Sequence, residues 1–155
     1  MSTSNENPAI VPVPGSSLRR VLALLNDTTA PIQSKEGKSS FLGKREGPSG
    51  PGLIEHHIQL SVQASQPIAA VRGQLDYFDT FNSKIQSQLL VWQRDLRPGQ
   101  PQSLEWTGKV DPDKFATLLT FTLFFEQVRM ADGSVWRPDS SEIAGQIRKL
   151  NLDTK

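Results

Sequence analysis

The chain has 155 residues, with 17 basic and 16 acidic side chains and a formal net charge of +1, so its charge favours neither nucleic acid nor anionic lipid as a partner. Cysteine is absent, which excludes disulfides, thiol nucleophiles and cysteine-ligated metal sites. No stretch approaches the roughly 20 apolar residues of a membrane span, and the first residues lack the pattern of a secretory signal. A cytoplasmic protein is the simplest interpretation.

The first third of the chain, residues 1–52, is rich in proline, glycine and serine and contains one aromatic residue, Phe41. A segment of this composition buries too little apolar area to offset the entropy lost on ordering. We therefore expect a largely disordered leader, followed by one folded domain over residues 53–155.

One run within the leader, SSLRRVLALLND, has apolar residues at helical spacing. They stand at i, i+3, i+4 and i+7, and are Leu18, Val21, Leu22 and Leu25. The spacing predicts a short amphipathic helix over residues 17–26. Because a helix of this length is marginal alone, it should dock on the chain's own domain, on a partner protein or on a membrane surface. Two arginines make a weak membrane anchor, which favours the first two surfaces.

From Leu53 onward, apolar and polar residues alternate, as they do in half-buried strands. Predicted strands cover residues 53–63, 68–78, 84–92 and 103–109, separated by turns rich in proline, glycine or aspartate. The longest apolar run lies in residues 118–136, where Asp132-Gly133 predicts a hairpin after a central strand. Strands at this spacing, without helices between them, indicate an antiparallel β-sandwich.

Two predicted strands carry apolar residues on both faces. The strand at residues 84–92 ends in the unbroken apolar run Leu89 to Trp92, so its outer face should also be covered. Leu90, Trp92 and Phe124 are expected to form this outer apolar face. Either the chain's own helices or another protein would cover it.

The last segment changes to helical periodicity. Asp139 is placed to cap a helix, and Ile143, Ile147 and Leu150 follow at i, i+4 and i+7. This pattern predicts a C-terminal helix over residues 140–150, which should cap an open end or an edge of the sandwich.

Three segments carry a resemblance to a known group of domains. They read VRGQLDYFD at 71–79, LRPGQPQSLEW at 96–106 and VRMADGSVW at 128–136. The order of these features resembles small immunoglobulin-like and fibronectin-like domains, including the FxLYD group found in many bacterial proteins. The resemblance implies an immunoglobulin-like sandwich that acts as a non-catalytic binding or spacer module, and it transfers no catalytic residue.

The sequence contains few residues suited to catalysis. On a strand, Glu55 and His57 share one face while His56 points to the other, so the two histidines cannot hold one metal ion together. We expect a core-edge His56 and a solvated His57, and we expect no metal and no cofactor. Aspartates in the predicted turns should serve local hydrogen bonding.

We therefore hypothesise a non-enzymatic interaction or assembly module that uses the leader helix and the outer apolar face to bind a protein, which is either another chain or further copies of this one. The residues predicted to bind the partner are Leu18, Val21, Leu22, Leu25, Leu90, Trp92 and Phe124. The alternative is a small-ligand-binding or hydrolytic domain with a pocket near His56, Tyr77 and Trp92.

Overall fold

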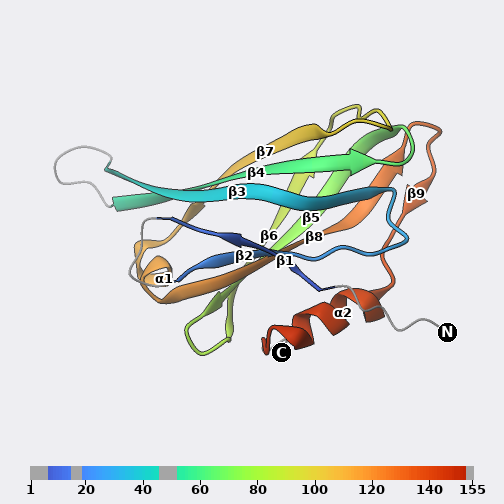
Figure 1. The fold of residues 1–155 in the computed structure, drawn as a ribbon. Coiled ribbons are helices and arrows are strands. Elements are labelled where there is room, and N and C mark those ends of the chain that lie inside the picture. The colour runs from blue at the N-terminus through green and yellow to red at the C-terminus, as the bar shows by residue number, and fades with distance from the viewer. Residues whose placement is uncertain (1–6, 15–18, 46–51, 153–155) are drawn as a thin grey trace.

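A computed structural model describes residues 7–14, 19–45 and 52–152 of the chain, which form two β-sheets packed face to face and two helices (Figure 1). Sheet A has the strand order β1-β2-β8-β5-β6, and the short strand β9 also pairs with β8. Sheet B has the order β3-β4-β7. The fold is therefore mainly β, as the sequence predicts.

The elements have the following bounds. Sheet A contains β1 (Ala9–Pro12), β2 (Val21–Leu24), β5 (Ile68–Asp79), β6 (Lys84–Trp92), β8 (Leu118–Met130) and β9 (Val135–Trp136). Sheet B contains β3 (Ile32–Arg45), β4 (Gly52–Ala64) and β7 (Gln102–Val110). The helices are α1 (Pro112–Thr117) and α2 (Ser140–Lys149).

Strand β8 is the centre of sheet A and builds much of the core. It pairs antiparallel with β5 along its length, and its alternate residues Phe121 and Leu123 are buried between the two sheets. The predicted hairpin after it is confirmed, because the Met130 N–H donates to the Ser134 carbonyl oxygen at 2.8 Å. Gly133 has a φ of 92°, which a residue without Cβ adopts at little cost.

The predicted helix over residues 17–26 is wrong. Residues Val21–Leu24 form strand β2, which pairs antiparallel with β1 and parallel with β8. Both faces of this strand are covered, since Leu22 enters the core between the sheets and Ala23 packs with α2. A doubly covered strand requires a continuous apolar run, and VLALL supplies that run as well as it supplies a helical stripe. Leu18 lies outside the described residues.

The predicted disordered leader is also wrong for most of its length. Strand β3 pairs antiparallel with β4 from Ile32 to Arg45, so the expected domain boundary near residue 52 falls inside one long hairpin (Figure 1). The prediction failed because β3 is mostly polar and lacks the apolar alternation expected of a strand. Its outward residues face solvent, and backbone pairing with β4 stabilises the strand without a continuous apolar run. Gly37 allows the close approach, because a Cβ there would lie 2.8 Å from the Gln59 carbonyl oxygen.

The predicted C-terminal helix is confirmed as α2, and Asp139 caps it by accepting the Ser141 N–H at 3.0 Å. Its position differs from the expectation. The helix lies on the outer face of sheet A (Figure 1), where Ile143 packs with Ala23 and Leu25 in a second, smaller core. It therefore covers part of a sheet face rather than an end or edge of the sandwich.

Candidate functional site

Three of the residues predicted to bind a partner belong to β2 or follow it directly. Leu22 is buried between the sheets, Leu25 is buried in the cluster that includes α2, and Val21 is half-buried. These side chains stabilise the fold of this chain, and they are not presented to a partner as an exposed helix would present them.

The faces of β6 are the reverse of those expected. Leu90 and Trp92 are buried in the core, and the Trp92 indole N–H donates to the Glu105 carbonyl oxygen at 2.8 Å. Leu89 and Val91 point outward instead, with exposed fractions of 58% and 56%. Because the run LLVW is apolar throughout, its sequence does not show which alternate residues face the core. The register with β5 places Leu90 and Trp92 inward.

Phe124 does point outward from sheet A, as expected. It is partly buried because it packs against the cluster of Ala23, Leu25 and Ile143. The chain's own helix α2 therefore covers the apolar residues over β2 and β8, whereas Leu89 and Val91 on the outer face of β6 are exposed.

His56 lies in the core between the sheets. Its Nδ1 is 2.7 Å from the Tyr77 hydroxyl oxygen, and its Nε2 is 2.7 Å from Ser39 Oγ. Phe41 stacks on the imidazole with the ring centres 4.2 Å apart, and Phe121 meets it edge-on. The expectation that His56 points to the core and His57 away from it is confirmed.

This environment keeps the imidazole neutral. Burial, with a smaller contribution from the charge of His57, lowers the pKa of His56 to about 3, and burial raises the pKa of Tyr77 above its ordinary range. A neutral imidazole has one donor and one acceptor nitrogen, and the hydroxyls of Tyr77 and Ser39 satisfy both. Trp92, the third residue of the predicted pocket, packs on Phe125 instead.

Arg20 extends this aromatic cluster in a way that the sequence did not indicate. Its guanidinium lies 4.0 Å from the centre of the Phe115 ring and donates to the carbonyl oxygens of Phe115 and Leu118, both at 2.7 Å. Desolvation lowers the pKa of the arginine. The contact is consistent with a structural cation–π pair that anchors the N-terminal segment.

His57 lies on the outer face of sheet B. Its Nε2 is 3.1 Å from Glu55 Oε1, and its Nδ1 is 3.1 Å from the Thr107 hydroxyl. Within the described ranges, no group of three or more His, Cys, Asp or Glu side chains is placed to hold a metal ion. A hollow of about 530 Å³ lies on this polar face, bordered by residues such as Gln63 and Ser61.

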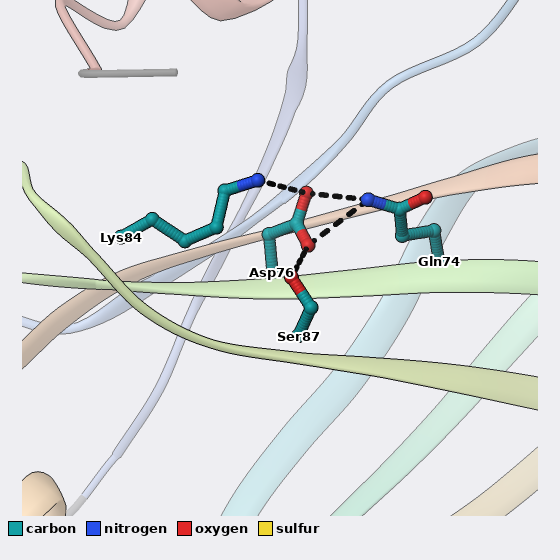
Figure 2. A network of polar contacts seen from close by, with 4 residues as sticks. All are labelled: Gln74, Asp76, Lys84 and Ser87. Carbon is teal, nitrogen blue, oxygen red and sulfur yellow. Dashed lines mark hydrogen bonds and ion pairs between the residues drawn. The ribbon is translucent and has the colours of Figure 1, made fainter. Parts of the chain in front are cut away.

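Asp76 is a buried carboxylate on the outer face of β5 (Figure 2). It accepts hydrogen bonds from Ser87 Oγ at 2.5 Å and from Gln74 Nε2 at 3.0 and 3.1 Å, and Lys84 Nζ lies 3.9 Å away. Ser87 and Lys84 belong to β6, so the network ties the edge strand to β5. Asp76 lies within the predicted strand over residues 68–78, and no pattern in the sequence indicates this role.

The exposed outer face of β6 is the strongest candidate for an interaction surface. Leu89 and Val91 of β6 stand beside Gln74 and Arg72 of β5, their respective partners in the ladder. We call these four residues the β6 surface. An ion pair between Arg72 and Glu126 borders it, and the two exposed aliphatic side chains form its apolar centre.

The chain matches no known protein family, no curated protein and no solved structure. Among the described residues, neither helix is long and apolar enough to cross a membrane.

Proposed function

We propose that the chain is a non-enzymatic β-sandwich module that binds a protein partner through the β6 surface. The observation that carries this proposal is the exposure of two neighbouring outward aliphatic residues, Leu89 and Val91, on an edge strand whose sheet is covered elsewhere by α2. Adjacent aliphatic side chains on an otherwise polar surface are typical of places where proteins meet.

The order of the strands supports an immunoglobulin-like or fibronectin-like topology. In the proposed topology, β3, β4 and β7 correspond to strands A, B and E, while β5, β6, β8 and β9 correspond to C, C′, F and G. Strand β9 has only two residues, and β2 pairs with residues 120–123 on the same edge of β8. By analogy of fold, this arrangement favours a binding or spacer module.

A ligand-binding or hydrolytic pocket near His56, Tyr77 and Trp92 has less support. Both nitrogens of His56 are engaged by hydroxyls, and aromatic rings pack around the imidazole. A general base needs access to the proton of a substrate, and the buried position of this histidine does not favour such access.

Site-specific photo-crosslinking in the native host tests the proposed surface. A photoreactive residue at position 89 should give one predominant covalent adduct, and the same residue at Thr107, on the outer face of sheet B, is the matched control. Val91→Lys in the position-89 variant should remove the adduct, because a charge on the edge disfavours an apolar contact. Equal labelling from both positions, or no adduct from position 89, would refute the proposal.

A further inference from the structure

Strand β6 forms one end of the strand order in sheet A among the described residues, and from Gln86 to Trp92 it lacks the usual protection of an edge strand. Residues 85–92 read IQSQLLVW, a run without charge, proline or glycine. Its pairing with β5 is regular from Gln86 to Trp92, since the register shift lies at Ile85, between Gln86 and Lys84. Natural edge strands usually carry charges, proline or bulges that prevent pairing with another chain.

The neighbouring edge, β7, is protected by side chains from β6 and the residues that follow it. Carbonyl oxygens of Ser103, Glu105 and Lys109 accept hydrogen bonds from side chains of this segment. The donors are Gln88, Trp92 and Arg94. The two β6 donors point inward, so these contacts leave the outward side chains of β6 available.

We infer that the β6 surface binds a second copy of this chain, with the two β6 strands pairing antiparallel about a two-fold axis so that sheet A continues from one copy into the other. This inference rests on the proposed function and names its partner. The chain carries a net charge of only +1, so two copies approach without strong repulsion.

Self-complementarity favours one register. When the strands pair around Leu90, Leu89 faces Val91 of the second copy and Val91 faces Leu89, which closes a cluster of four aliphatic side chains on the outer face. A register around Leu89 would instead place Lys84 opposite Arg94 of the second copy, and like charges directly opposite are destabilising. The pairing around Leu90 is closed, so it produces a dimer and not a fibre.

The absence of cysteine from the sequence allows a direct test of this register in the full chain. Leu89→Cys and Val91→Cys chains are mixed and oxidised, and the Thr107→Cys chain is the control. Random pairing of equal amounts would make the mixed disulfide about half of the product, and we expect its share to be well above that, because cross-strand partners lie within disulfide distance. A statistical mixture of the three products, or equal crosslinking of the control, overturns the register.

Sedimentation of the unmodified chain tests the dimer itself. We expect a monomer–dimer equilibrium, and Leu89→Lys or Val91→Lys should raise its dissociation constant about tenfold or more. Thr107→Lys should leave it unchanged, and circular dichroism should report the same fold for all variants, because the altered side chains are exposed.

A chain that is monomeric at every concentration overturns the inference, as does a dimer that neither lysine variant weakens. The proposed function would survive that failure if photo-crosslinking from position 89 still captured a different protein. It would fail together with the inference if position 89 captured nothing.

Discussion

Asn26 and Gln146 bind each other through two hydrogen bonds, although 120 residues separate them in the sequence. The Asn26 N–H donates to Gln146 Oε1 at 3.3 Å, and Gln146 Nε2 donates to the Asn26 carbonyl oxygen at 2.8 Å. Both residues are buried. The side-chain amide therefore satisfies backbone groups just beyond β2 and holds α2 against sheet A.

Asp27 and Thr28, which follow Asn26, also form hydrogen bonds with residues at the start of α2. The Asp139 N–H donates to Asp27 Oδ2 at 2.8 Å, and the Thr28 N–H donates to Glu142 Oε1 at 2.9 Å. The three contact residues of the helix, at 139, 142 and 146, lie on one helical face. A short segment after β2 thus determines where α2 docks.

Replacing Gln146 should loosen this docking. We expect Gln146→Ala to lower the free energy of unfolding by about 1–3 kcal/mol, because it leaves the buried N–H and C=O of Asn26 without their partner. Urea denaturation measures the change, and amide exchange should rise across α2. Arg148→Ala, on the exposed side of the same helix, is the control and should change stability little. A neutral Gln146→Ala variant would show that apolar packing alone holds the helix.

His56 should make stability depend on pH. The unfolded chain binds a proton at this residue below its ordinary pKa near 6.5, whereas the folded chain does so only near the lowered pKa of about 3. Protons therefore favour the unfolded state in this window, and stability is lost as pH falls through it. The expected contribution of His56 is a loss of roughly 3 kcal/mol between about pH 7.5 and pH 4.5.

Urea midpoints across this pH range measure the loss. His56→Gln removes the titrating group and should flatten the profile, although it lowers stability at neutral pH. His57→Gln should keep most of the slope, because burial is the first cause of the lowered pKa. Identical slopes for the unmodified chain and His56→Gln would contradict the prediction.

Thr122 carries a buried hydroxyl without a hydrogen-bond partner within the described part of the chain. Thr122→Val keeps the shape and removes the unsatisfied group, so it should be neutral or raise stability by about 1 kcal/mol. Thr122→Ser keeps the hydroxyl, loses a methyl group and should be destabilising. A clear loss of stability in the valine variant, measured by urea denaturation, would indicate that the hydroxyl has a partner in solution.

Leu22 distinguishes a core strand from a docking segment. We expect Leu22→Ala to lower the free energy of unfolding by about 2–5 kcal/mol, the usual range for a large-to-small change in a core. Ile10→Ala, at an exposed position in the neighbouring strand β1, should change it far less. Thermal and urea denaturation provide the measurement, and near-neutral results at position 22 would place β2 outside the core.

Local patterns in the sequence determined several elements of this protein. The hairpin after β8 follows from Asp132-Gly133, the start of α2 from the cap at Asp139, and the bounds of β6 from its apolar run and flanking turns. In each case the deciding interactions join residues close together in the chain, so the sequence contains the whole signal.

Tertiary structure decided the conformation of β2, the ordering of β3 and the orientation of β6, because the segments that contact these strands are distant in the sequence. The run VLALL fits both a helical and a strand pattern. It forms a strand because its backbone pairs with the edge of β8 and because α2 covers its outward side chains. The polar strand β3 is ordered by pairing with β4. The register with β5 turned Leu89 and Val91 outward and Leu90 and Trp92 inward, and a shift of one residue would have exchanged the exposed pair for the buried one.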